Sequence, residues 1–333
     1  MTEFHKPEPS YAPPLMAVGL TCVLWGVVTS WIVSAIGLVV TGVAAALWIG
    51  DFGVGQADAP RPTASQVRAA TAKRAPQAIS RPWLHGVTVL LAFSTLLLIV
   101  LGAGVTSKAG QPWEISHLVA GATVGALTLT IAMLRRNRFG WTMLGVALLL
   151  ALLGNRNPVV AALHAFLAQI FFAGTVMWAL VSSQSWKRDP EIATDMAKPS
   201  LRTLSLITVG VVVAQVALGA AVRHKVMGAG IHITGALVVA LMIVVLGVLV
   251  MNQCPTHRTL RPAAIAMMVI AGAQVFLGFG AFIVRMMADE NTLPVQIATI
   301  GHVTTGALTL ASTVVLALEI RRNLRGERTG DDI

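Results

Sequence analysis

Long apolar runs separated by short polar segments dominate the sequence, and this pattern limits how the chain can fold. A transmembrane helix needs about 20 consecutive apolar residues, and the runs here reach that length. Only 11% of the 333 residues are Asp, Glu, Lys or Arg, against about 25% in an ordinary soluble domain. A membrane β-barrel would instead show alternating segments of about 10 residues. The sequence therefore predicts an all-α integral membrane protein.

We expect ten spans in this sequence, of which the first two form an N-terminal extension and the other eight form the body. The apolar stretch over 15–49 is too long for one span, because a helix rises about 1.5 Å per residue. We therefore divide it near Ser30 and Trp31. The predicted spans are 15–30, 33–49, 84–106, 114–134, 140–154, 159–182, 202–222, 228–251, 262–284 and 294–319.

The distribution of positive charge predicts the orientation of these spans. The chain carries 24 Lys and Arg against 14 Asp and Glu. If successive spans alternate in direction, 19 basic residues fall on the side of both termini and 5 on the other side. Such a bias marks the cytoplasmic side of a membrane. We therefore expect a multi-pass protein of the inner (cytoplasmic) membrane with both termini cytoplasmic, in contact with membrane lipid and not with nucleic acid.

An internal repeat divides the eight-span body into two halves. The string LGAGVTSK at 101–108 is echoed by LGAAVRHK at 218–225, and AQVALG at 214–219 is echoed by AQVFLG at 273–278. Each half has an even number of spans, so both halves keep the same orientation. The expected parts are a membrane hairpin (1–50), a cytoplasmic linker (51–81), two homologous four-helix halves (82–200 and 201–322) and a cytoplasmic tail (323–333).

Four of the eight histidines lie near the outer ends of body spans, two in each half. A single histidine near a helix end is more often a hydrogen-bonded interfacial residue, but an ionisable residue inside a span is a functional candidate. Zinc and copper sites usually gather cysteine or carboxylate ligands as well, whereas two histidines from two helices of a bundle suit the two sides of a haem iron. The predicted metal ligands are His117, His164, His232 and His302.

Glu114 stands three residues before His117, so the two share a helix face if the helix begins by then. One role for Glu114 is that of a helix-start carboxylate, which the helix dipole stabilises. The other is that of a partly buried general base beside the site of His117. Both roles remain open from the sequence.

Basic residues at the outer side are candidates for contacting the carboxylates of a bound haem. Arg223 and Arg285 each end a span there, and either extend to the membrane interface or pair with carboxylates in bidentate fashion. Lys108 and Lys225 are further candidates for the same role.

These residues resemble the haem A synthase family, membrane proteins that assemble the haem of cytochrome oxidase. The resemblance covers roughly residues 82–322. It rests on two four-helix halves, the four outer histidines, the E-x-x-H pattern of Glu114 and His117, and the repeated L-G-A-x-V strings. Further matching strings are WLH at 83–85, LHAFLAQIFF at 163–172 and LGAAVRH at 218–224.

The resemblance implies oxidation of the methyl group of haem O to the formyl group of haem A. It implies that haem O is the substrate, haem A the product and haem b an electron carrier. Glu114, His117 and His164 match the half that receives the substrate, and His232 and His302 match the half that holds haem b. Other respiratory-complex or oxidase-assembly proteins are the implied partners.

The chain departs from this family in its outer loops. It lacks the cysteine pair that many bacterial members carry in the first outer loop, and only SKAGQPW (107–113) and HKVMG (224–228) remain of the two loops. Leu118 stands where an arginine often follows the first histidine. Two alternatives stay open: a di-haem b electron-transfer subunit of a respiratory complex, and an assembly or structural subunit whose haem sites are partly lost.

Overall fold

The computed structural model describes residues 16, 19, 31–54, 82–107, 111–154, 157–289 and 292–326. The chain separates into two compact units, Met1–Ala78 and Ile79–Ile333. In the first unit, helix α2 (Trp31–Val54) contains the predicted span 33–49. The predicted span 15–30, apart from Met16 and Gly19, and most of the linker predicted over 51–81 lie outside the described residues.

The second unit contains the helices that correspond to the predicted body, and each lies within a few residues of its predicted bounds. Seven helices among the described residues are long and apolar enough to cross a membrane, whereas α6, with 15 residues, is shorter. The protein is therefore a predominantly helical membrane protein with several spans. The helices are α4 (Pro82–Thr106), α5 (Gln111–Arg135), α6 (Arg138–Leu152), α7 (Pro158–Ser182), α9 (Leu201–Arg223), α10 (Ala229–Gln253), α11 (Leu260–Met287) and α12 (Leu293–Asn323).

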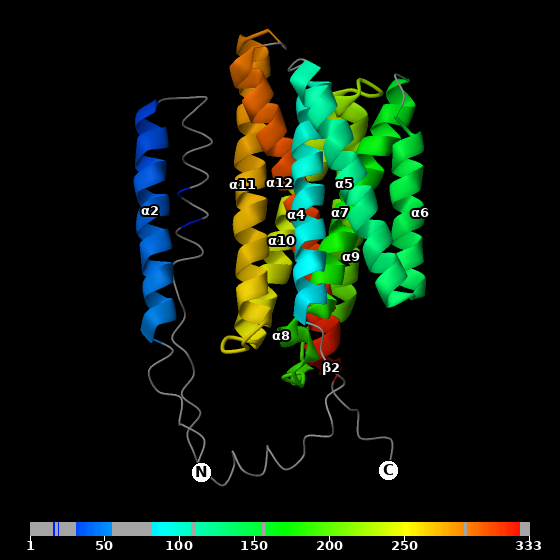
Figure 1. Cartoon of the computed structure of the whole chain (residues 1–333). Helices are drawn as coiled ribbons and strands as arrows, with labels where there is room; N and C mark the ends of the chain where they lie inside the picture. The colour runs from blue at the N-terminus through cyan, green and yellow to red at the C-terminus, as the bar shows by residue number, and fades with distance from the viewer. Residues whose placement is uncertain are drawn as a thin grey trace, which may run out of the picture. The chain divides into compact units, whose positions relative to one another are not determined.

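Two sets of four helices show the same pattern of contacts. In the first set, α4 packs on α5, α5 on α6, α6 on α7 and α7 on α4. In the second set, α9, α10, α11 and α12 repeat this ring in the same order. Within the second unit, the helices of both sets run along a roughly common direction (Figure 1).

Helix α12 joins the two sets. It packs against α4 and α7 of the first set as well as against α9 and α11 of its own. Half of its most apolar stretch (50%) is buried inside the protein, against 17–28% for the other six long helices. The buried cluster between the sets consists of Ile99, Phe172, Ala307 and Ala311. The other helices expose large apolar side chains such as Phe93 and Leu118, as expected for lipid-facing surfaces.

The segment between the two sets forms a small sheet with the residues that follow α12. Strand β1 (Ala193–Asp195) pairs in parallel with strand β2 (Leu324–Gly326). A four-residue helix, α8 (Gln184–Lys187), precedes β1 in the same segment. The tail expected over 323–333 thus begins with a paired strand, which the sequence analysis did not foresee.

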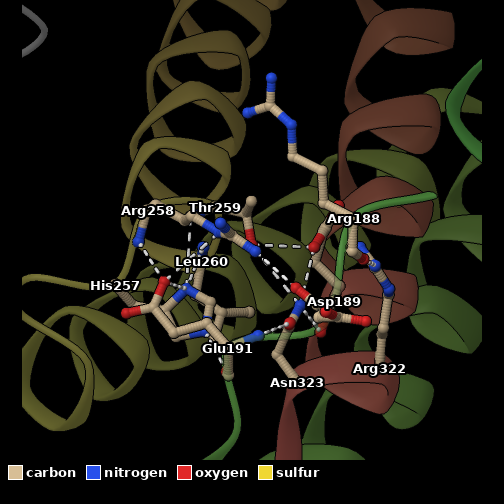
Figure 2. Close-up of polar contacts among 10 residues, drawn as sticks. Arg188, Asp189, Glu191, His257, Arg258, Thr259, Leu260, Arg322 and Asn323 are labelled. Carbon is tan, nitrogen blue, oxygen red and sulfur yellow. Dashed lines mark hydrogen bonds and ion pairs between the residues drawn. The ribbon is translucent and has the colours of Figure 1, made fainter. Parts of the chain in front are cut away.

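Polar contacts hold this segment against the second set at the end opposite to the candidate histidines (Figure 2). The buried ring of His257 donates through Nε2 to the carbonyl oxygen of Glu191 (2.8 Å). Its Nδ1 accepts from the backbone N–H groups of Thr259 and Leu260, at 3.2 and 3.3 Å. Because these amides open α11, His257 caps that helix. His257 is therefore a buried structural residue.

Glu319 is buried in the last turns of α12 and forms hydrogen bonds in the same region through one carboxylate oxygen. Its Oε2 accepts from Oγ1 of Thr259 (2.9 Å) and from Nδ2 of Asn323 (2.8 Å). The side-chain oxygen of Asn323 accepts in turn from the backbone N–H of Glu191. These bonds link α11, α12 and the segment that joins the two helix sets.

Candidate functional site

The four candidate histidines form two pairs at one end of the second unit. His117 of α5 and His164 of α7 have ring centroids 6.4 Å apart, with ring planes at 63°. His232 of α10 and His302 of α12 have ring centroids 6.2 Å apart, with ring planes at 82°. All four side chains are half-buried. Each pair thus joins the second and fourth helices of its own set.

The ring separation in each pair suits two imidazoles on opposite sides of one metal ion. An imidazole nitrogen binds a metal such as zinc at about 2.0–2.1 Å, so two rings that share an ion have centroids about 6 Å apart. Among the described residues, no group of three or more His, Cys, Asp or Glu could hold a metal ion. Each pair therefore offers two imidazole rings and no third protein ligand among the described residues.

A glycine of the preceding helix lies beneath three of the four rings. Because glycine has no side chain, the imidazole can lie directly on the backbone of the neighbouring helix. The distances from an added Cβ to the ring Cε1 atom are 3.0 Å for Gly102 to His117, 3.0 Å for Gly219 to His232 and 2.7 Å for Gly278 to His302. Any larger residue at these positions would displace the ring.

These glycines belong to a pattern that our sequence analysis recognised only in part. The pattern Leu/Gln-x-x-Leu-Gly occurs at 98–102, 150–154, 215–219 and 274–278, once in each helix that precedes a candidate histidine. In α6 the helix ends at Leu152, before the glycine. There the carbonyl oxygen of Leu150 lies 3.1 Å from Nδ1 of His164. At His164, a contact with a backbone carbonyl thus takes the place of the contact with a glycine.

The first position of this pattern distinguishes the two sets. It is Leu98 and Leu150 in the first set, and Gln215 and Gln274 in the second. Nε2 of Gln215 lies 3.0 Å from Nδ1 of His232 and donates to the backbone oxygen of the same residue at 2.8 Å. Nε2 of Gln274 lies 3.4 Å from Nε2 of His302. The second pair therefore has amide side chains beside it where the first has leucines.

Glu114 lies in the first turn of α5, one helical turn before His117. Its side chain is exposed, whereas the general-base role considered from the sequence assumed partial burial. The preceding residue, Trp113, packs flat on the end of α4: a Cβ added at Gly104 would lie 2.0 Å from the indole ring. This contact fixes the turn that carries Glu114, whose side chain remains exposed.

Arg223 connects the two helix sets at the histidine end. Its Nη2 donates to Oγ of Ser107 (2.7 Å) and to Oγ1 of Thr106 (3.2 Å), both at the end of α4. His224 follows it and caps α9. Burial is the main cause that lowers the pKa of His224. The positive charge of Arg223 lowers this pKa further, and His164 has a smaller effect in the same direction. His224 is thus a residue near the first pair that the sequence analysis did not select as a candidate.

The other three basic candidates differ in whether and where the structure describes them. Arg285 in the last turn of α11 and Lys225 after α9 are exposed at the histidine end. Lys225 adopts a positive φ of 60°, which turns the chain sharply after α9. Lys108 lies outside the described residues.

No protein-family model matches the chain, and no curated protein is significantly similar to it.

Proposed function

We propose that this protein binds haem at both histidine pairs and converts haem O to haem A in the cytoplasmic membrane. The observation that carries this proposal is the equal ring separation of the two pairs, 6.4 and 6.2 Å, although the rings come from four different helices. Facing helices of a bundle commonly supply histidines to a cofactor in the core. The glycines beneath three of the rings support the proposal further, because they let each ring lie against the backbone of the neighbouring helix.

In this proposal the pair of His117 and His164 receives haem O, and the pair of His232 and His302 holds haem b. Haem b would supply one-electron redox chemistry when bound. Arg223, Arg285 and Lys225 supply positive charge at the same end of the helices, where haem propionates would need it. Lys108, which lies outside the described residues, is a further candidate for this role. Other oxidase-assembly proteins would deliver the substrate and accept the product.

Glu114 has the role of general base in this proposal. The reaction replaces hydrogens of a methyl group by one oxygen, which we take to come from water. The protons leave to a base, and the electrons leave to a one-electron acceptor in the membrane. An exposed carboxylate one turn from His117 is placed to take a proton from water or from the oxidised methyl group.

The same proposal includes the membrane arrangement. The body has eight spans in two duplicated halves, the first two spans add a hairpin, and both termini are cytoplasmic. The bias of Lys and Arg supports this orientation. It places the histidine pairs near the outer surface, and reporter fusions after residues 137, 225 and 326 would test it.

A second function, electron transfer between two b-type haems in a respiratory complex, is favoured by one observation. The connections at the histidine end are very short: α9 and α10 are separated only by residues 224–228. No long outer loop can therefore cover a reacting haem there. This function needs both histidine pairs but not Glu114.

One experiment separates these functions. The protein is purified from cells that make haem O, and its pigments are identified by pyridine haemochrome spectra and mass. Haem O or haem A beside haem b supports the synthase, whereas haem b alone at both sites supports electron transfer. Absence of haem in protein from haem-replete cells rejects both.

Glu114→Ala then tests the catalytic role, with Ser116→Ala as an exposed control on the same helix. We expect Glu114→Ala to abolish haem A production while the haem content stays normal. Unchanged haem A production would show that Glu114 has no catalytic role.

A further inference from the structure

The end of the second unit that lies opposite to the histidine pairs carries an excess of positive charge. Residues 184–202, 255–261 and 319–326 form this end and contain nine Lys and Arg against four Asp and Glu. Two of the four acids, Asp195 and Glu319, are buried. The exposed surface of this end is therefore strongly basic.

Hydrogen bonds to backbone carbonyls bring arginines of this end together. Nη2 of Arg202, in the first turn of α9, donates to the carbonyl oxygen of Arg321 (2.8 Å), in the last turn of α12. The next residue, Arg322, donates through Nη2 to the carbonyl oxygen of Arg188, in the segment between the two helix sets. Its guanidinium carbon also lies 4.7 Å from the ring centre of Trp186. The fold thus holds both guanidinium groups in place.

Arg258, just before α11, joins the same group of residues. Its Nη2 donates to the carbonyl oxygen of Asp189, in the segment between the two sets (Figure 2). Its Nε lies 3.6 Å from Oε2 of Glu191, which forms an exposed ion pair with it. Three helix ends therefore contribute guanidinium groups to one basic cluster, which consists of Arg202, Arg258 and Arg322.

The bonds that hold this cluster leave most of its charge uncompensated. A carbonyl oxygen carries no net charge, so Arg202 and Arg322 are positioned there without being neutralised. A guanidinium group has five N–H donors, and one bond to a carbonyl leaves others for a ligand. Like charges that are held close together repel, and a bound anion would relieve this repulsion. Because folding has already ordered these side chains, an anion can bind with little further loss of entropy.

We propose that the basic cluster binds the phosphate group of an anionic phospholipid, such as phosphatidylglycerol, from the surrounding membrane. Guanidinium groups bind phosphate oxygens in bidentate fashion. The cluster lies where α9 and α11 begin and where α12 ends. For helices that cross a membrane, this is the level of the lipid headgroups, and basic sites there bind anionic lipids. Exposed Ile192 and Met196, on either side of β1, supply apolar surface in the same segment.

Two exposed arginines of the first helix set provide a matched control. Arg136 and Arg138 lie at the connection between α5 and α6, at the same end of the helices as the basic cluster. Helix α6 packs against α5 and α7 of its own set. Salt at 0.15 M screens charges that are more than about 8 Å apart. Loss of these two charges should therefore have little effect on a lipid bound at the cluster.

The test titrates phosphatidylglycerol into the purified full-length protein in neutral detergent and follows thermal unfolding. A ligand that binds only the folded state raises the unfolding temperature. We expect phosphatidylglycerol to stabilise the protein, and phosphatidylcholine and inorganic phosphate to have no such effect at equal concentration. Arg202→Gln/Arg322→Gln should weaken the lipid affinity about 30-fold, because each basic residue near an anionic headgroup contributes about a factor of five. Arg136→Gln/Arg138→Gln should keep the affinity within about 2-fold.

Three results would overturn this lipid site. The first is an equal loss of affinity in the two double variants, which would show a general effect of surface charge. The second is equal stabilisation by inorganic phosphate, which would show a site for a free anion. The third is a wild-type protein that phosphatidylglycerol does not stabilise. If Arg202→Gln/Arg322→Gln does not fold, Arg321→Gln/Arg325→Gln removes two exposed charges of the same end; it should also weaken the affinity more than the control does, and an equal effect overturns the site.

Discussion

Replacement of Gly278 by alanine would test whether His302 is a ligand held against the backbone of α11. The new Cβ would lie 2.7 Å from Cε1 and 3.0 Å from Nδ1 of the ring. Ordinary contact begins at 3.4 Å, so the ring has to move by the difference, about 0.7 Å. Metal–ligand distances in a working site vary by only about 0.2 Å. The displaced ring should therefore no longer reach the iron.

The effect on folding should be much smaller than the effect on binding. Alanine is about 1 kcal/mol more favourable than glycine inside a helix, whereas overpacking costs about 1–3 kcal/mol. The net loss of stability in Gly278→Ala is then about 0–2 kcal/mol. Gly280→Ala is the matched control, because a Cβ at Gly280 meets nothing within 4 Å. Gly280→Ala should gain the higher helix propensity of alanine without a cost from overpacking.

The assay is haem per chain in both purified variants, with thermal unfolding in detergent as the measure of folding. Gly280→Ala should keep its haem and unfold at the wild-type temperature or above it. Gly278→Ala should remain folded and lose haem from one of the two sites. If Gly278→Ala holds as much haem as Gly280→Ala, with the same absorption spectrum, the argument that His302 is a ligand positioned by α11 is refuted.

Three further predictions concern residues outside the histidine pairs. Glu319→Ala should lower the free energy of unfolding by about 1–3 kcal/mol, because Thr259 Oγ1 loses its buried acceptor. Glu319→Gln keeps an acceptor, so an equal loss of stability in both variants would contradict this reasoning. Asn157→Ala should cost about 1 kcal/mol in denaturant unfolding, since its side chain accepts from the first amides of α7. In a Cys22→Ala background, Cys254 should react slowly with maleimide at neutral pH, because burial and the nearby carboxylates raise the pKa of its thiol. Rapid labelling of the folded protein would contradict a buried thiol with a raised pKa.

The helix positions could be predicted because composition alone determines them in a membrane. Every backbone polar group must be paired inside the bilayer, so an apolar run of sufficient length forms a helix along most of its length. The span predicted at 140–154 was less accurate, since α6 ends at Leu152. Strands β1 and β2 were not predicted, because three-residue strands depend on a partner that is distant in the sequence.

The candidate site could be predicted only in part. The depth and repetition of the histidines indicated which rings belong together, and the structure brings those rings close. The contacts beneath the rings were missed, although the pattern Leu/Gln-x-x-Leu-Gly is present in the sequence. The role of His257 could not be predicted, because its partner Glu191 belongs to a segment 66 residues away.

Helix packing, and not the outer loops, fixes the distance between the two histidine pairs. Ala307, little more than one turn after His302, is buried in one cluster with Ile99 of α4 and Phe172 of α7. α4 carries the glycine beneath His117, and α7 carries His164. Small residues at this junction let the helices approach closely. In the proposed function, electron exchange between the two haems needs a constant separation, and this junction would supply it even with loops as short as residues 224–228.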